Sequence, residues 1–291
     1  MKKKILITGV AGFIGSNFLK YLSNHDYEIY GIDFDIIKNN DERIFDLNLI
    51  DSEKTKDIFE KIKPAFVFHL AAFAGPPRNE ENPKLAYRYN VEILKIVLSN
   101  LSKSTPIFFP STDKVFVGHK YPNEKTKLNP DSVHGKVKLE CEKLIKDHTQ
   151  KFFIIRQPVV HSNGGYVRNS KMSGPGSFID KAIDSIKSNK KVEIFANVKR
   201  CFIKIDELIS VYKMLIESEK FGTYNLASPM ISYYDRLVQI CEKNKIKYNK
   251  VLIPTKGNIV PLEQDIDSSK FEKTFQIKMS WLILRCLKEN F

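Results

Sequence analysis

The sequence has few cysteines and no long apolar run. Four cysteines, Cys141, Cys201, Cys241 and Cys286, are spread over 291 residues, and no pair has the CxxC spacing of a metal or redox site. Such sparse thiols are typical of a reducing compartment. No stretch approaches the roughly 20 apolar residues that a membrane span needs. We therefore expect a soluble, cytoplasmic protein that has no metal site and does not bind membranes.

Arginine is scarce as well, although the chain is strongly basic. Only eight of the 47 basic residues are arginine, and the formal net charge is +13. A nucleic-acid reader usually shows clustered arginines with a groove-entering motif, whereas the lysines here are scattered singly. We expect no nucleic-acid partner. The charge is either a solvated lysine surface or a positive field that helps to capture an anionic substrate.

Two motifs that would point to other classes of protein are missing. The start, MKKKILITGVAGFIGS, has the basic and apolar parts of a secretion signal, but Thr8, Gly9 and Gly12 interrupt the apolar run and no small-residue cleavage site follows. The G-x-S-x-G elbow of many hydrolases is also absent. We expect neither a cleaved signal nor hydrolase chemistry.

Short apolar runs alternate with helical patterns over the first half of the chain. We expect strands at 4–8, 27–33, 44–46, 65–71, 106–111 and 152–157, and helices at 13–23, 52–63, 83–101 and 134–148. Repeated strand–helix–strand units form a parallel sheet covered on both faces, and right-handed crossovers make it doubly wound. The fold class is therefore α/β, a Rossmann-like doubly wound parallel sheet with a smaller C-terminal lobe.

The pattern changes after Pro158. A segment rich in Gly, Asn and Ser covers 161–177. Helices are expected beyond it at 178–188, 206–219, 233–244 and 281–288, with strands at 192–195, 201–205 and 223–226. We divide the chain into a first domain, residues 1–160, and a substrate-binding lobe, residues 161–291. This division allows some strands of the second part to return to the first domain.

A glycine motif directly follows the first expected strand and opens the first helix. It reads Gly9-Val-Ala-Gly12-Phe13-Ile14-Gly15. Gly9 permits a tight turn, Gly12 lets a pyrophosphate approach the backbone, and Gly15 lets the helix pack against the strand. The pyrophosphate then lies on the N-terminal amides of the helix. These five numbered residues are our first candidates for binding a dinucleotide.

Asp33 ends the second expected strand, 18 positions after Gly15. A carboxylate there accepts both hydroxyls of an adenosine ribose and repels a 2′-phosphate. The cofactor is therefore expected to be NAD rather than NADP. Lys38, a little further on, is the residue that most opposes this choice.

The G-x-x-G-x-x-G spacing resembles that of the short-chain dehydrogenase/reductase superfamily. Further motifs resemble its extended, nucleotide-sugar-modifying branch, the NAD-dependent epimerase/dehydratase family. The segment STDKVFVG at 111–118 looks very like the strand-five motif of dTDP-4-dehydrorhamnose reductases. The resemblance implies further cofactor-binding residues at Asp46, Leu47, Leu70, Ala71, Ala72, Asn90, Lys138 and Pro158.

Members of this family carry a Tyr-x-x-x-Lys pair, and four-residue spacing places both side chains on one helical face. Here the matching residues are His134 and Lys138, while Thr112 keeps the hydroxyl that holds the substrate oxygen. The resemblance therefore implies a catalytic set of Thr112, His134 and Lys138, with Lys138 also holding the nicotinamide ribose. The chain departs from the family pattern at His134.

An imidazole in place of the phenol changes the proton chemistry. Lys138 and an oxidised nicotinamide are both positive and would lower the pKa of His134. A neutral His134 can accept a proton from a sugar hydroxyl during oxidation, but it starts in the wrong state to donate one during reduction. Imidazole is also shorter than phenol, so the proton passes either directly or through a bridging water. Alternatively, His134 only packs on its helix and catalysis is lost or moved.

The resemblance also implies contacts to a substrate. Arg200 precedes an F-I pair in a stretch resembling the one whose arginine grips the nucleotide diphosphate. The expected substrate-binding residues are Thr112, Asp113, Lys114, Arg78 and Arg200. Arg78 is either a sugar contact or a surface charge. Arg168 and Lys171 are either phosphate partners or solvated loop charges.

We therefore expect an NAD-dependent enzyme that acts on a nucleotide-diphosphate sugar through a keto-sugar, by oxidation, reduction or epimerisation, in a setting such as polysaccharide biosynthesis. The alternative is a protein that binds NAD and a ligand but does little chemistry. We also expect a homodimer formed through helices 83–101 and 134–148, because the first of these has more apolar residues than one buried stripe requires. Those residues are Leu85, Ile93, Leu94, Ile96, Val97 and Leu98.

Overall fold

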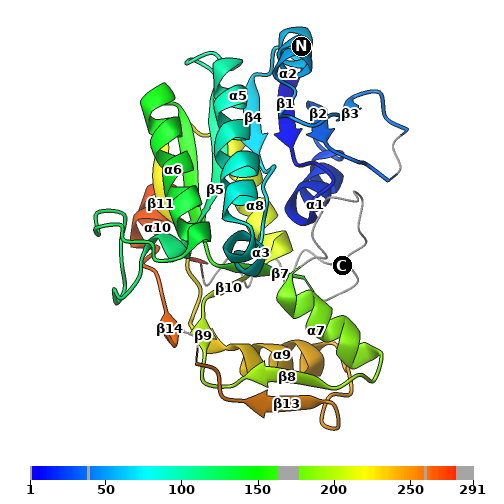
Figure 1. Ribbon diagram of the computed structural model, residues 1–291, viewed down its shortest axis with the longest axis vertical. Coiled ribbons are helices and arrows are strands. Elements are labelled where there is room, and N and C mark those ends of the chain that lie inside the picture. Colours follow the sequence, from blue (N-terminus) through cyan, green and yellow to red (C-terminus); the bar gives the residue numbers. More distant parts are fainter. Residues whose placement is uncertain (1, 38–39, 163–176, 259–260, 280–291) are drawn as a thin grey trace.

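A seven-stranded parallel sheet forms the centre of the molecule (Figure 1). The computed structural model describes residues 2–37, 40–162, 177–258 and 261–279. The strands lie in the order β3-β2-β1-β4-β5-β6-β11, and each neighbouring pair is parallel. Their bounds are β1 Lys3–Thr8, β2 Tyr27–Asp33, β3 Ile44–Asp46, β4 Phe66–His69, β5 Ile107–Thr112, β6 Phe152–Gln157 and β11 Gly222–Asn225. The expected Rossmann-like sheet is confirmed.

Two layers of helices cover the sheet, one on each face. Along β1, Ile5 and Ile7 join the core on one face and Leu6 joins the core on the other. A strand that is buried on both faces has a continuous apolar sequence rather than one that alternates between apolar and polar residues. The first face packs against α1 Phe13–Leu22, α8 Ile205–Ile216 and α10 Ser269–Phe275. The second packs against α2 Ser52–Ile62, α5 Ile93–Ser99 and α6 Val133–His148.

The helix expected over 83–101 forms in three parts. These are α4 Pro83–Tyr87, a π-helical turn η1 Arg88–Glu92, and α5. Asn90 lies in the π turn and is buried, and its Nδ2 donates to the carbonyl of Ala86 at 2.7 Å and to that of Phe73 at 3.5 Å. Such π turns are frequent at functional sites.

Most of the apolar surplus assigned to a dimer interface lies inside the chain itself. Ile93, Leu94, Val97 and Leu98 pack into the core on the second face of the sheet. The sequence argument for a dimer is therefore wrong for these four residues. Leu85, on α4, is 40% exposed, and Tyr87 beside it is 42% exposed.

The C-terminal lobe lies below the sheet in Figure 1 and has its own core. Its main elements are α7 Phe178–Lys187, β8 Val192–Phe195, α9 Tyr233–Lys243 and β13 Leu252–Thr255. Short strands connect it to the sheet: β7 Val159–His161 with β10 Phe202–Lys204, and β9 Lys199–Arg200 between β12 Ile231–Ser232 and β14 Glu263–Gln264. Because β11 joins the sheet and α8 and α10 pack on it, these parts of residues 161–291 lie with the first domain.

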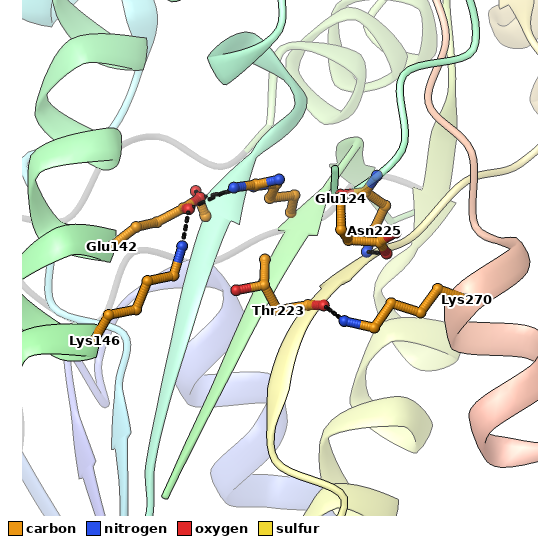
Figure 2. A network of polar contacts seen from close by, with 8 residues as sticks. Glu124, Glu142, Lys146, Thr223, Asn225 and Lys270 are labelled. Carbon is orange, nitrogen blue, oxygen red and sulfur yellow. Dashed lines mark hydrogen bonds and ion pairs between the residues drawn. The ribbon is translucent and has the colours of Figure 1, made fainter. Parts of the chain in front are cut away.

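A buried ion pair fixes α6 against the sheet. Arg156 on β6 donates to both carboxylate oxygens of Glu142, at 2.9 and 2.7 Å, and Ser111 on β5 donates to the same group at 2.6 Å. Burial opposes ionisation of Glu142, but Arg156 and Ser111 together hold its pKa below the usual value. Figure 2 shows Glu142 with Lys146, which lies 3.3 Å away one turn along the helix. The helix that carries His134 and Lys138 is thereby fixed relative to β5 and β6.

Several segments differ from the sequence expectation. The strand expected at 201–205 is shorter in the structure, where it is β10 at 202–204 with Ile205 already in α8. Two short elements, α3 Pro76–Glu81 and the 3₁₀ turn η2 Asp113–Val115, were not expected. The helix expected at 281–288 lies outside the described residues. None of the described helices is long and apolar enough to cross a bilayer.

Candidate active site

The glycine turn brings β1, α1 and the end of β4 into close contact. Gly9 has a φ of +73°, and its amide donates to the carbonyl of Ile32 at 2.8 Å. A Cβ atom at Gly9 would lie 2.5 Å from the amide nitrogen of Ala71, and one at Gly15 would lie 2.1 Å from the carbonyl oxygen of Gly9. Only glycine fits these two positions.

The helix α1 begins at a glycine. Gly12 is its N-cap residue, with no side-chain cap and no acidic residue in the first turn, where Phe13 and Ile14 stand. A Cβ at Gly12 would have one close neighbour, the Gly9 carbonyl at 3.2 Å. The N-terminus of a helix favours an anion because its amides and dipole are positive. The turn therefore fits the pyrophosphate of a dinucleotide.

Asp33 joins the end of β2 to this turn. Its carboxylate accepts from the amides of Ala11 at 2.7 Å and Phe34 at 2.8 Å. Burial raises the pKa of Asp33, while these amides and that of Gly12 oppose the rise. Each carboxylate oxygen has a further lone pair. Asp33 can therefore accept ribose hydroxyls without losing its contacts to the turn.

Asp46 and Leu47 lie directly beside Asp33. The amide of Leu47 donates to the Asp33 carbonyl at 2.7 Å, and Asp46 accepts from the amide of Asp35 at 2.8 Å. Asp46 is exposed, whereas Leu47 is buried. Their place at the carboxyl end of β2 and β3 agrees with a position beside an adenine, which stays a prediction.

The strand-four residues line the same edge of the sheet. The amide of Leu70 donates to the Thr8 carbonyl at 3.0 Å, and that of Ala71 donates to Thr8 Oγ1 at 3.3 Å. Ala72 is exposed, and Pro158 is buried just after β6. Ligands of open α/β sheets bind outside the carboxyl ends of the strands. The predicted cofactor residues thus share one edge of the sheet, and their contacts to a cofactor stay predictions.

Thr112 ends β5 and begins the turn η2. Its hydroxyl donates to Asp113 Oδ1 at 3.1 Å and accepts from the amide of Lys114 at 3.2 Å. Burial raises the pKa of Asp113, and the charges of Lys114 and Arg200 partly offset this effect. The three predicted substrate residues of this segment therefore form one connected turn.

Lys138 is buried, and its ammonium lies in the second turn of α6. Its Nζ donates to the carbonyl of Pro110 at 2.8 Å and lies 4.5 Å from the centre of the Phe109 ring. Burial lowers the pKa of Lys138 to about 8, against the opposing effects of Cys141 and Glu142. An ammonium has three donors, so two remain for the hydroxyls of a ribose.

His134 lies one turn before Lys138 and is half-buried. Its Nδ1 lies 3.0 Å from Oδ1 of Asn79, which comes from α3. Burial lowers the pKa of His134 to about 3, and the positive charges of Lys138 and Lys114 add to the effect. The ring is therefore neutral at neutral pH.

Gly135 allows α6 to approach the turn that carries Thr112. A Cβ at Gly135 would lie 2.5 Å from the carbonyl oxygen of Lys114 and 2.8 Å from Cβ of Pro130. This close approach packs the first turn of α6 directly on η2. The structure thus brings the elements of Thr112, His134 and Lys138 together, as the resemblance implied.

The predicted arginines have partners of their own. The guanidinium of Arg200 is buried and donates to the carbonyls of Lys199 at 2.6 Å, Leu262 at 3.0 Å and Pro261 at 2.9 Å. A phosphate would have to compete with these three carbonyls for the N–H groups of Arg200. Phosphate binding therefore stays a prediction. Arg78, on α3, lies 4.2 Å from the centre of the Phe73 ring. Lys38, Arg168 and Lys171 lie outside the described residues.

Sequence reasoning missed Asn79, although it contacts the key side chain. Helix α3 has only six residues, too few to show a helical period. The G-P-P at 75–77 was the available signal, because proline is favoured in the first turn of a helix. Within the described residues, no group of His, Cys, Asp and Glu could hold a metal ion.

Comparison with curated proteins finds two kinds of relative. A dTDP-D-glucose 4,6-dehydratase of Dictyostelium discoideum is 27% identical over 262 residues, covering 78% of this chain and 58% of that protein. Methionine adenosyltransferase 2 subunit beta of Rattus norvegicus is 24% identical over 286 residues, covering 93% and 82%. In the shorter alignments, this chain spans about half the length of the relative.

Among solved structures, the dTDP-4-dehydrorhamnose reductase of Bacillus anthracis in complex with NADP has a TM-score of 0.79. The match covers 94% of this chain and 92% of that one at 20% identity, so it concerns the fold. The model of the NAD dependent epimerase/dehydratase family matches residues 5–227. The family description agrees with the dinucleotide cofactor that the glycine turn predicts. The chain belongs to the NAD-dependent epimerase/dehydratase family.

Proposed function

We propose that this protein oxidises a hydroxyl group of a nucleotide-diphosphate sugar, with NAD as the acceptor and His134 as the base. The observation that carries the proposal is the position of His134. Its ring contacts Asn79 and lies one turn before a buried Lys138, and burial together with the charges of Lys138 and Lys114 lowers its pKa and so favours the neutral imidazole. A neutral base can take a proton but has none of its own to donate from the free nitrogen.

The chain has groups for each part of NAD. The α1 amides beside Gly12 fit the pyrophosphate, and the Asp33 carboxylate fits the adenosine ribose. Lys138 has two ammonium hydrogens left for the nicotinamide ribose. When bound, NAD supplies the acceptor for the hydrogen and electron pair that leave the sugar carbon.

His134 takes the proton in this scheme. As the sugar carbon is oxidised to a carbonyl, the hydroxyl proton passes to Nε2 of His134, directly or through one water. The product is a keto-sugar and an imidazolium. Thr112 stays within the same connected turn as Asp113, where its hydroxyl oxygen can contact the substrate oxygen. The nearby Lys138 and Lys114 disfavour the imidazolium, which makes this base weaker than an ordinary histidine.

The relatives support a nucleotide-diphosphate sugar as the substrate class. Two of the proteins named above act on dTDP-linked sugars by their names. The charge of +13 favours the approach of a doubly anionic diphosphate. Arg200 is the proposed phosphate contact, provided that its carbonyl partners at 199, 261 and 262 leave a donor free.

A second candidate is a binding protein with little turnover. Two observations favour it: the catalytic tyrosine of the family is replaced by His134, and one group of relatives is named as the beta subunit of methionine adenosyltransferase 2. Such a protein would use the same glycine turn and Asp33 but would not need a proton acceptor.

One experiment separates the two. The purified protein is mixed with NAD and, in turn, with UDP-, GDP- and dTDP-linked sugars, while calorimetry records binding and absorbance records reduced cofactor. Reduced cofactor formed with one sugar class supports the proposed NAD-dependent oxidation. Binding of NAD and a sugar nucleotide without any reduced cofactor supports the binding protein instead.

We also propose that the protein is a homodimer. Leu85 and Tyr87 are both exposed on α4, in the helical region that the resemblance assigns to pairing. Light scattering at micromolar concentration tests this: a monomer mass would contradict it. Leu85→Glu should convert the dimer to a monomer without changing NAD binding.

A further inference from the structure

Asn79 is wholly buried and is bonded at both ends of its side chain amide. Its Nδ2 donates to the carbonyl of Phe73 at 2.7 Å, and its Oδ1 lies 3.0 Å from Nδ1 of His134. A backbone carbonyl only accepts hydrogen bonds, so the amide nitrogen must face Phe73. The amide oxygen must then face His134.

This orientation decides which ring nitrogen of His134 carries the hydrogen. The amide oxygen of Asn79 is also only an acceptor, so Nδ1 of His134 must donate to it. Turning the amide over would set two oxygens against each other at the Phe73 carbonyl. Asn90 also donates to that carbonyl, at 3.5 Å, which holds it in place.

The other ring nitrogen is left with a lone pair. A neutral imidazole has one hydrogen, and with that hydrogen on Nδ1 the Nε2 atom is an acceptor. Within the described part of the chain, the hydrogen bond of the His134 ring is the one at Nδ1. The nitrogen that the proposed reaction needs is therefore the one that this tautomer leaves as an acceptor.

Helix α3 is itself fixed to α6. Glu80, next to Asn79, accepts from the amide of Val133 at 2.8 Å, and the Asn79 amide donates to the Gly75 carbonyl at 3.1 Å. The charged residues on the elements packed around the first turn of α6 include Lys136 and Lys138 on α6, Asp113 and Lys114 on η2, Arg78, Glu80 and Glu81 on α3, Lys84 on α4, and Arg88 and Glu92 on η1; Glu140, Glu142, Lys143, Lys146 and Asp147 follow further along α6. None of these makes a hydrogen bond or ion pair to the imidazole in the described structure, so Asn79 alone sets its tautomer.

We propose that Asn79 is a positioning residue that holds His134 as the Nδ1–H tautomer and thereby keeps Nε2 ready to accept the substrate proton. This inference rests on the proposed role of His134 as the base. Asn79 itself does not touch the reacting atoms. It acts on the state and the orientation of the ring.

The first test needs no variant. In ¹⁵N NMR spectra of the intact protein at neutral pH, Nδ1 of His134 should have the shift of a protonated nitrogen and Nε2 that of an unprotonated one. The signals are assigned by their loss in His134→Phe. A protonated Nε2 in the wild-type protein would overturn the inference, whatever the activity of the protein.

The second test separates the two bonds of Asn79. Asn79→Leu removes both, whereas Asn79→Asp keeps an acceptor for His134 and loses the donor to Phe73. We expect the Leu variant to lose kcat for oxidation by about tenfold or more, less than the roughly 10²–10⁴-fold that a general base contributes, with KM for the sugar nucleotide unchanged. The Asp variant should recover most of that loss and shift the pH profile upward, because a carboxylate raises the pKa of a histidine.

Asn82, at the end of α3, is the matched control. It is exposed and donates to the Arg78 carbonyl at 3.5 Å, without contact to His134. Asn82→Leu should leave the tautomer and the rate unchanged. Equal loss in the Leu and Asp variants would assign Asn79 to holding Phe73 and would overturn the inference. If the wild-type protein has the Nδ1–H tautomer but oxidises no sugar, the proposed function fails while the assignment of Asn79 to the tautomer stands.

Discussion

The glycine turn before α1 and the first turn of α6 lie at the same carboxyl edge of the sheet, but they relate to the family pattern in different ways. At the glycine turn, backbone atoms fill the space where a side chain would begin: a Cβ at Gly15 would lie 2.1 Å from the Gly9 carbonyl. At α6 the backbone is just as crowded, since a Cβ at Gly135 would lie 2.5 Å from the Lys114 carbonyl. The neighbouring side chain is nevertheless changed, with His134 where the family has tyrosine.

This difference indicates that different residues determine the backbone packing and the proton chemistry of the site. The close backbone approaches hold together the elements that carry Thr112 and Lys138. The proposed proton carrier, His134, is one half-buried side chain that can change without disturbing that packing. Its electrostatic surroundings are also distinct: burial raises the pKa of Asp33 at the turn and lowers that of His134 on the helix.

Restoring the family residue should have the largest effect. His134→Tyr should raise the rate of keto-sugar reduction, because a tyrosine beside Lys138 carries a proton to donate near neutral pH whereas the neutral His134 does not. We expect a gain within the roughly 10²–10⁴-fold range of general acid catalysis. The measurement is the consumption of reduced cofactor with keto-sugar nucleotides. No gain, in a variant that still binds NAD, would show that His134 is not the determinant.

Two glycine substitutions should separate packing from binding at the turn. Gly15→Ala forces a methyl group into the Gly9 backbone and should lower the free energy of unfolding by about 3 kcal/mol. Gly12→Ala meets one atom at 3.2 Å, so it should remain folded but bind NAD more weakly. Denaturant titration and calorimetry check the two effects. Equal losses of stability in both variants would contradict the distinction.

Acid should destabilise the protein through its buried histidines. Burial lowers the pKa of His69 to about 3 and that of His161 to about 4. The unfolded chain binds these protons below about pH 6.5 while the native state does not, so stability is full above that pH and falls as the pH drops toward the native values. Between pH 7 and 5 we expect a loss of about 2 kcal/mol for each of these histidines.

Thermal unfolding measured across this pH range checks the expectation. In the unaltered protein, Thr8 Oγ1 lies 2.9 Å from Nδ1 of His69. His69→Asn keeps a hydrogen-bonding partner for Thr8 and should reduce the dependence of stability on pH. His119→Gln, at an exposed position, should leave the slope unchanged. A slope that His69→Asn does not alter would assign the acid sensitivity to other groups.

The smallest expected effect concerns the choice of cofactor. Asp33→Ala removes the carboxylate that fits the ribose hydroxyls and opposes a 2′-phosphate. We expect the preference for NAD over NADP, about tenfold or 1.4 kcal/mol, to disappear. Calorimetry with both cofactors measures it. Tighter binding of NADP than of NAD by the unaltered protein would contradict the assignment of Asp33.

The strands of the sheet and its long helices could be predicted from the sequence because their apolar periods are long and regular. The π turn at 88–92 and the short helix α3 could not, since each depends on contacts with distant residues. The sequence allowed strands of the second part to return to the sheet, but it did not say that β11 would pair with β6. The site shows the same limit. Lys138 follows from its spacing, whereas Asn79 meets His134 across 55 positions and Arg200 is bound to carbonyls at 261 and 262.

The central claim is that His134 is the base for sugar oxidation, and one comparison tests it most directly. Initial rates of cofactor reduction are measured at saturating NAD for the wild-type protein and for His134→Phe, with the sugar nucleotide that gives turnover. Calorimetry confirms that both proteins bind NAD equally. The account predicts a loss of roughly 10²–10⁴-fold in the Phe variant. An unchanged rate in a variant that binds NAD normally would contradict it.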